Sequence, residues 1–157
     1  MTNPGNNAYL RTRVMTATPA ELRMMLLDGA VKYACQGREG MAKKDFEAMF
    51  NGISACRNIV VELMTSISDD VDRTLADRVR SLYTFLFTEL TTASMEKSVP
   101  KMDKIIELLE YEAQTWRMLL EKLANERPVT TGVAGSLRGT VNGGFAGGLG
   151  ESAALSA

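Results

Sequence analysis

Apolar residues recur at the spacing of an α-helix in four long segments of the chain, at about 19–38, 43–66, 73–95 and 98–125. Side chains three and four positions apart share one face of a helix, so each segment predicts an amphipathic helix. No stretch shows the alternation of apolar and polar residues that is typical of a strand. Four helices of similar length joined by short turns predict an all-α fold, an antiparallel up-down four-helix bundle.

The first of these helices has a clear start and an unusually apolar surface. Thr18 can cap its N-terminus, Pro19 stands where a missing N–H costs nothing, and Glu21 can complete a capping box. Beyond the cap, apolar side chains occupy most of the helix circumference, so we expect other helices to enclose it. Gly37 and Gly40 predict its end.

The middle two helices carry more apolar surface than a core needs. In the helix at 43–66, the stripe expected to face the core consists of Phe46, Phe50, Ile53, Val60, Met64 and Ile67. A second, adjacent stripe consists of Met49, Gly52, Cys56, Ile59 and Leu63. The expected core stripe of the helix at 73–95 consists of Leu75, Val79, Leu82, Leu86, Leu90 and Ala93. Tyr83, Phe85 and Phe87 cannot all point inward, because successive helical residues are rotated by about 100°.

Two flanking segments lack a helical pattern of this length. Residues 1–17 open with a breaker-rich stretch and then supply a few apolar groups, which predicts a flexible N-terminal segment. Residues 127–157 are rich in glycine and their apolar residues follow no period, which predicts a disordered tail. The chain is therefore expected to divide into an N-terminal segment at 1–17, a helical domain at 18–126 and a tail at 127–157.

Composition argues against several classes of function. The chain contains no histidine and no phosphate-binding loop, so we expect neither an enzyme nor a bound cofactor or metal. A net charge of −1 gives no basic field for nucleic acid. Cys35 and Cys56 form no C-x-x-C pair, which favours two buried thiols in a reducing compartment. Because no signal sequence is present and no segment reaches the roughly 20 apolar residues of a membrane span, we expect a cytoplasmic protein without membrane insertion.

The surplus apolar surface indicates contact with another polypeptide. It can form a groove for an amphipathic partner helix or a face for self-association. A third interpretation is a wide core in a tightly wrapped bundle. Small side chains on one middle helix and aromatic side chains on the other suit a groove that holds a helix.

Several segments resemble the flagellar export chaperone FliS family. After Tyr9, the run VMTATPAEL at 14–22 and the run MLLDGAVKY at 25–33 are similar to the family patterns V-x-T-A-x-P-x-E-L and M-L-Y-D-G-A-I-K-F. Supporting matches follow at 59–63, 82–85 and 90–93 and at Trp116. Leu27 and Ser94 stand where the family often has tyrosine and asparagine.

The resemblance implies a cytoplasmic chaperone without a cofactor. Such a chaperone binds the C-terminal helical segment of flagellin, prevents premature polymerisation and assists flagellar type III export, with export-gate components as further partners. The resemblance implies that the N-terminal segment can act as a lid through Tyr9, Leu10 and Val14; the alternative is that it simply packs on the bundle. The residues expected to contact the partner are Tyr9, Leu10, Met49, Gly52, Cys56, Ile59, Tyr83, Phe85, Leu86 and Phe87. The alternative is a structural homo-oligomeric helical bundle that does not bind flagellin, and a weak homodimer is compatible with either function.

Overall fold

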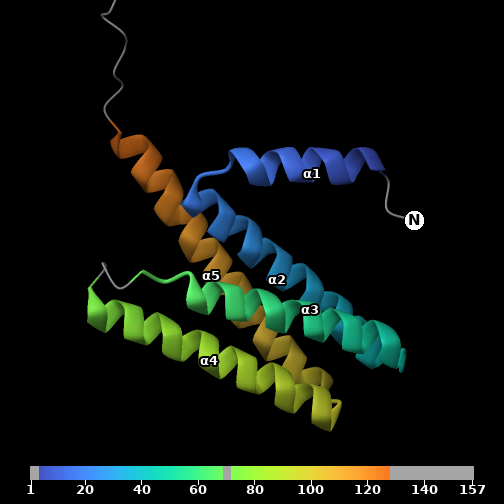
Figure 1. Cartoon of the computed structure of the whole chain (residues 1–157). Coiled ribbons are helices and arrows are strands. Elements are labelled where there is room, and N and C mark those ends of the chain that lie inside the picture. The colour runs from blue at the N-terminus through green and yellow to red at the C-terminus, as the bar shows by residue number, and fades with distance from the viewer. Residues whose placement is uncertain (1–3, 69–71, 128–157) are drawn as a thin grey trace, which may run out of the picture. The chain divides into compact units, whose positions relative to one another are not determined.

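The computed structural model describes residues 4–68 and 72–127, and all regular secondary structure in these residues is helical. Its helices are α1 (Pro4–Thr16), α2 (Pro19–Ala42), α3 (Phe46–Thr65), α4 (Arg73–Glu96) and α5 (Val99–Glu126), shown in Figure 1. The prediction of an all-α fold is confirmed for these residues, but they form five helices where the sequence predicted four. The predicted disordered tail lies outside the described residues, apart from Arg127.

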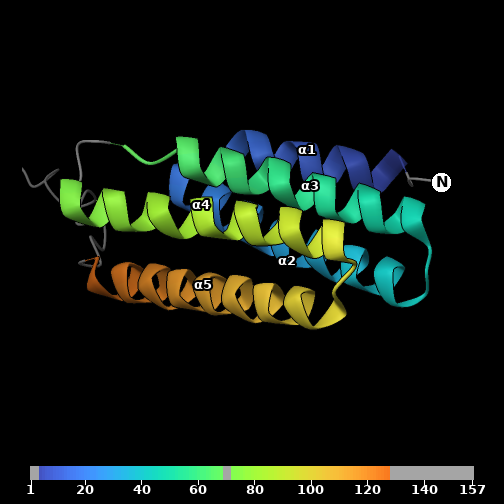
Figure 2. The same cartoon turned by 90° about the horizontal axis from the view of Figure 1, so that it is seen from below.

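Helices α2 to α5 contact one another in a closed order. Helix α2 packs against α3 and α5, and α4 packs against the same two helices. In both Figure 1 and Figure 2, α3 and α4 run side by side along most of their length. Because the contacts close in a ring, the α3–α4 pair and the α2–α5 pair form opposite sides of this group of helices.

The core lies between these four helices, which bury one face each. Most of its buried side chains are aliphatic, so the removal of apolar surface from water is the main stabilising contribution. The largest side chains that are fully enclosed are Tyr83, Leu27, Ile53, Leu63, Leu86, Leu90, Met102, Leu109, Val60 and Cys56.

Glycines let α2 and α3 pack backbone against backbone. A Cβ atom added to Gly52 would lie 2.4 Å from the backbone N of Gly37. A Cβ added to Gly40 would lie 2.5 Å from the backbone N of Met49. The prediction that Gly37 and Gly40 end the first long helix is therefore wrong, because α2 continues to Ala42 and uses both glycines to approach α3.

This close approach also decides which stripe of α3 faces the core. Met49, Gly52, Cys56 and Leu63 are buried, although the sequence assigned them to the additional stripe. Phe46 and Phe50 were assigned to the core stripe, yet they are 49% and 65% exposed. Of the expected core stripe, only Ile53 and Val60 are buried. They are the members nearest to the small residues Gly52 and Cys56 around the helix axis.

Local signals set the helix starts. The capping box at α2 is confirmed: the Thr18 hydroxyl accepts from the Glu21 backbone N–H at 3.2 Å, and Glu21 accepts from the Thr18 backbone N–H at 2.8 Å. Helix α3 begins at Phe46, three residues later than expected, because Asp45 provides its N-cap by accepting from Ala48 N–H at 3.1 Å.

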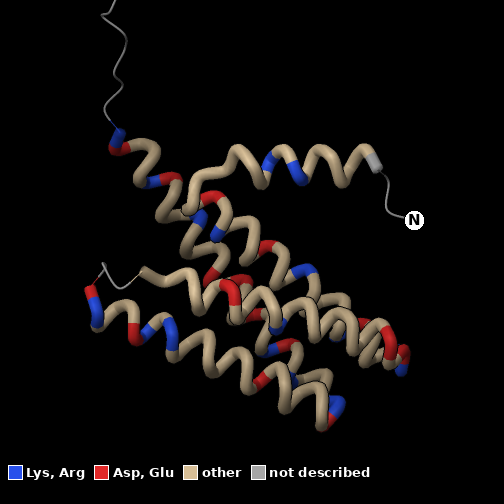
Figure 3. The backbone as a smooth tube through the Cα atoms, in the orientation of Figure 1, with Lys and Arg blue, Asp and Glu red and all other residues tan. Residues whose placement is uncertain are grey.

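Helix α1 differs from the others because its side chains from Gly5 to Thr16 are exposed. The apolar pattern here was too short to predict an independent helix, whereas the structure shows a helix from Pro4 to Thr16. In Figure 3 it carries basic but no acidic residues, while both signs alternate along α2 to α5. Within the described residues, no helix is both long and apolar enough to cross a membrane.

Candidate functional site

Exposed apolar side chains gather along the α3 face that turns toward α4. Phe46, Phe50 and Val61 are exposed, and their spacing of four and eleven residues places them on one side of α3. Phe87 of α4 is half-buried and packs against the core. We call these four side chains, Phe46, Phe50, Val61 and Phe87, the aromatic strip.

Two cation–π contacts connect α3 and α4 along the aromatic strip. The Lys97 ammonium lies 4.3 Å from the ring centroid of Phe46, and the Arg57 guanidinium lies 5.2 Å from that of Phe87. These contacts link the start of α3 to the end of α4 and the middle of α3 to the middle of α4. Phe50 lies on α3 between Phe46 and Arg57, and its ring has no such cover in the described residues.

The Arg57 side chain is an incompletely satisfied part of this surface. Its Nε atom is buried and makes no hydrogen bond within the described residues. A buried donor without a partner costs about 1–3 kcal/mol. An incoming apolar group that displaces Arg57 from Phe87 would break the cation–π contact. Exposure of the Nε donor to water would offset part of that loss.

A partly buried polar cluster around the buried Tyr83 ties the four packed helices together near the start of α2. Arg23 donates to the Tyr83 hydroxyl at 3.0 Å and to the Ser66 hydroxyl at 3.3 Å. Its guanidinium also lies 5.2 Å from the ring centroid of Trp116, whose indole N–H donates to the Ala20 carbonyl at 3.2 Å. Burial raises the pKa of the Tyr83 hydroxyl above its ordinary value, although Arg23 acts in the opposite direction.

The predicted partner-binding residues of α3 lie mostly inside the structure. Met49, Gly52 and Cys56 are buried, the glycine at the contact with α2. Burial raises the pKa of the Cys56 thiol to about 12. Ile59 is half-buried, and its Cδ1 lies 3.3 Å from the position of a Cβ added to Gly29. Of the four predicted residues of α3, only Ile59 has a side chain that is partly accessible to a partner in this conformation.

The predicted residues of α4 point in different directions. Tyr83 and Leu86 are fully buried. Phe87 belongs to the aromatic strip, whereas Phe85 is exposed on another side of α4, because two residues correspond to about 200° of rotation. Tyr9 and Leu10 are exposed on α1. The structure therefore does not bring the predicted residues into one patch, and their contact with a partner stays a prediction.

Sequence reasoning did not assign Phe46 and Phe50 to a binding surface. Either stripe of α3 satisfies helical periodicity, so spacing alone cannot say which one faces inward. The glycines were the usable signal: Gly37, Gly40 and Gly52 mark the closest approach of two helices, and the stripe that contains Gly52 must therefore be enclosed.

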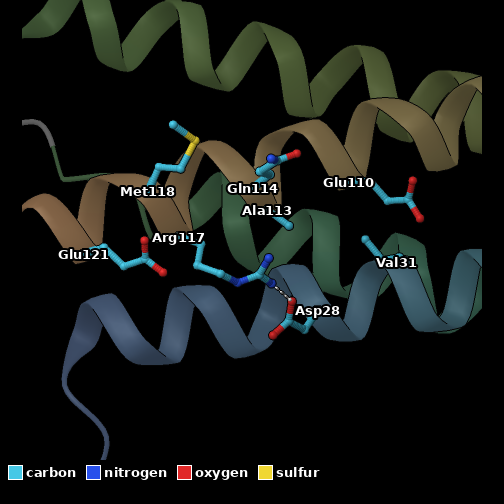
Figure 4. A pocket seen from close by; sticks show the side chains of 8 residues that line it. All are labelled: Asp28, Val31, Glu110, Ala113, Gln114, Arg117, Met118 and Glu121. Atoms are coloured by element: carbon cyan, nitrogen blue, oxygen red, sulfur yellow. Dashed lines mark hydrogen bonds and ion pairs between the residues drawn. The ribbon is translucent and has the colours of Figure 1, made fainter.

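The opposite side of the helix group carries a groove between α2 and α5 with a volume of about 530 Å³. Arg117 of α5 and Asp28 of α2, which both line it, form an ion pair at 3.1 Å, as Figure 4 shows. Cys35 lies on the same side of α2, because it follows the groove residues Asp28 and Val31 by seven and four positions. Burial raises the pKa of its thiol, and the charge of Glu110 acts in the same direction. Cys35 is exposed, so the prediction that both thiols are buried is wrong for this one.

The described residues contain no group of three or more histidine, cysteine or carboxylate side chains that could hold a metal ion. What the arrangement offers is an apolar surface on two adjacent helices, which is typical of proteins that bind an amphipathic partner helix.

Comparison with known proteins specifies this class as flagellar secretion chaperones. The sequence pattern of the family described as "Flagellar protein FliS" matches residues 1–123. The flagellar secretion chaperone FliS of Bacillus subtilis is 21% identical over 127 residues, covering 81% of this chain and 94% of the relative. That of Salmonella typhimurium is 25% identical over 126 residues, covering 77% of this chain and 93% of the relative. The chain belongs to the FliS family.

Proposed function

We propose that the protein is a cytoplasmic export chaperone for flagellin. It binds the C-terminal helical segment of flagellin, prevents its premature polymerisation and assists its export through the flagellar type III apparatus, where components of the export gate receive it. The mechanism needs no catalysis and no cofactor. The observation that carries the proposal is the aromatic strip on a chain of this family.

The chemistry of the strip supports this mechanism. An amphipathic helix gains about 25 cal/mol for each Å² of apolar surface that it buries, and the exposed rings of Phe46 and Phe50 provide such surface. Aromatic side chains are frequent energetic centres of protein interfaces. A flagellin segment that is bound through its apolar face cannot use that face to polymerise. Its release from the chaperone requires only dissociation of the complex.

The helical scaffold and α1 have parts in the same proposal. The closed contact order of α2 to α5 and their short connections support an antiparallel up-down four-helix bundle as the rigid platform. Helix α1 is exposed in the conformation described, and it acts as a lid by moving onto the client-binding surface in a second conformation of the client-free chain. Tyr9 and Leu10, both exposed on α1, are its proposed contacts.

A charged substitution in the strip tests the proposal. Phe50→Glu places a carboxylate in the centre of the strip and should weaken binding of a flagellin C-terminal peptide at least tenfold, since hot-spot truncations typically cost 2 kcal/mol or more. Tyr111→Glu is the matched control, because Tyr111 of α5 is 67% exposed and Phe50 is 65% exposed. Calorimetric titration gives the affinity, and thermal melts should stay within a few degrees for both variants. Equal affinities of the two variants would contradict a role for the strip.

The competing function is a structural homo-oligomer in which two copies pair their aromatic strips. The same exposed rings favour it, because a self-complementary apolar face is what an isologous dimer requires. Sedimentation of the chain alone separates the two functions. A stable dimer that Phe50→Glu dissociates, and that does not bind the flagellin peptide, would support the oligomer.

A further inference from the structure

The groove between α2 and α5 is a second candidate docking surface, on the side opposite the aromatic strip. Val31 and Ala113 contribute apolar surface to it. Glu110 and Glu121 line it toward its two ends, on the same helix, as Figure 4 shows. Eleven residues of α5 separate them, which is three turns or about 16 Å along the axis.

The charges of this groove are not balanced within the chain. Asp28 of α2 is paired with Arg117 of α5. Among the described residues, neither Glu110 nor Glu121 has an ion-pair partner. Two carboxylates without an ion-pair partner, beside the apolar side chains of Val31 and Ala113, are complementary to a helix that carries cations beside a stripe of small apolar side chains.

We propose that the α2–α5 groove docks a basic amphipathic helix of another protein, one with Lys or Arg side chains about three turns apart. This docking goes beyond the proposed function, because it uses neither the aromatic strip nor flagellin, and both surfaces can be occupied together. The chain's own α1 does not fit this description. Its cations, Arg11 and Arg13, are two residues apart and point about 200° away from each other, so they cannot pair with both carboxylates.

The native thiols allow a direct measurement of groove occupancy. Cys35 is exposed beside Glu110, and Cys56 is buried, so a maleimide fluorophore attaches to Cys35 of the wild-type chain. The probes are two designed 18-residue helical peptides with the same Ala and Leu stripe, one with Lys and one with Glu at two positions eleven residues apart. The Lys peptide should shift the fluorescence saturably and the Glu peptide should not, and rising salt should weaken the response.

Charge reversal then tests the two carboxylates. Glu110→Lys combined with Glu121→Lys should weaken binding of the Lys peptide about tenfold or more. The matched control, Glu62→Lys combined with Glu126→Lys, changes the net charge equally at exposed positions outside the groove and should bind like the wild type.

Three results would overturn the proposal. In the first, neither designed peptide binds, or both bind with the same affinity. In the second, the groove variant and its control lose the same affinity for the Lys peptide. In the third, Arg11→Glu combined with Arg13→Glu raises the affinity for the Lys peptide. The last result would show that α1, of the same or a second copy, fills the groove, and sedimentation would separate these two cases. None of these outcomes depends on binding of a flagellin peptide, so the proposed function is tested independently.

Discussion

Arg23 is the residue at which the four packed helices meet. It extends from α2 to Ser66 after α3, to Tyr83 of α4 and to the ring of Trp116 of α5. In the sequence Arg23 is a single cation inside an apolar run, with nothing that indicates a partner 60 residues away. Burial and charge of the cluster depend on the assembled helices, so this centre could not be predicted from local spacing.

The Tyr83 hydroxyl predicts a pH dependence of stability. Its folded pKa is raised above the ordinary value of about 10, so the folded chain holds this proton more tightly than the unfolded chain does. The contribution of this group to the free energy of unfolding is fully present below pH 10 and is lost as the pH rises through the folded pKa. We expect urea melts to show a falling free energy of unfolding above pH 10.

Tyr83→Phe supplies the control for that pH dependence. Removal of the hydroxyl should cost about 1–2 kcal/mol at pH 7, because Arg23 loses a hydrogen bond. The decline above pH 10 should become shallower in the variant than in the wild type. Parallel curves for the two proteins would assign the alkaline loss to other groups.

The two thiols should react at very different rates. Cys35 is exposed, whereas Cys56 is buried with a pKa raised to about 12. Because the thiolate is the reactive form, a disulfide reagent at pH 8 should modify one thiol in the folded chain and two in 6 M guanidinium. Rapid reaction of two thiols in the folded chain would show that the α2–α3 contact opens readily.

At the level of elements, the existence of α2 to α5 could be predicted because their periodicity and caps are local. Thr18, Pro19 and Glu21 specify the start of α2 without help from the rest of the chain. The ends and faces depend on neighbours. Gly37 and Gly40 resemble a stop signal in isolation and become a packing surface only when α3 lies against them.

Two glycine substitutions test this helix contact. Gly52→Ala places a Cβ 2.4 Å from the Gly37 backbone N, and backbone cannot move aside cheaply, so the free energy of unfolding should fall by more than about 2 kcal/mol. Gly29→Ala meets only the flexible Cδ1 of Ile59 at 3.3 Å, and the helix propensity gained is about 1 kcal/mol. Chemical melts should therefore show a large loss for the first variant and little change or a gain for the second. Equal effects would mean that α2 and α3 do not approach this closely.

At the scale of the whole molecule, the helices separate two surfaces of different chemistry. The α3–α4 side presents aromatic rings accompanied by Lys97 and Arg57. The α2–α5 side presents a groove with free carboxylates. The sequence predicted that apolar surface would be left over, because three aromatic residues on one helix cannot share a face. That this exposed apolar surface lies at Phe46 and Phe50 follows from the packing of α3 against α2, and the sequence of one helix alone cannot predict that packing.

The central claim is that the aromatic strip holds the flagellin C-terminal segment. The most direct measurement is ¹⁹F NMR of the chain labelled with fluorophenylalanine, with resonances assigned by single Phe→Leu replacements and followed as the flagellin segment is added. The account predicts saturable shifts of Phe46, Phe50 and Phe87, with a smaller change at Phe85 on the other side of α4. Binding that leaves the three strip resonances unmoved, or the absence of any shift at a saturating concentration of the segment, would contradict it.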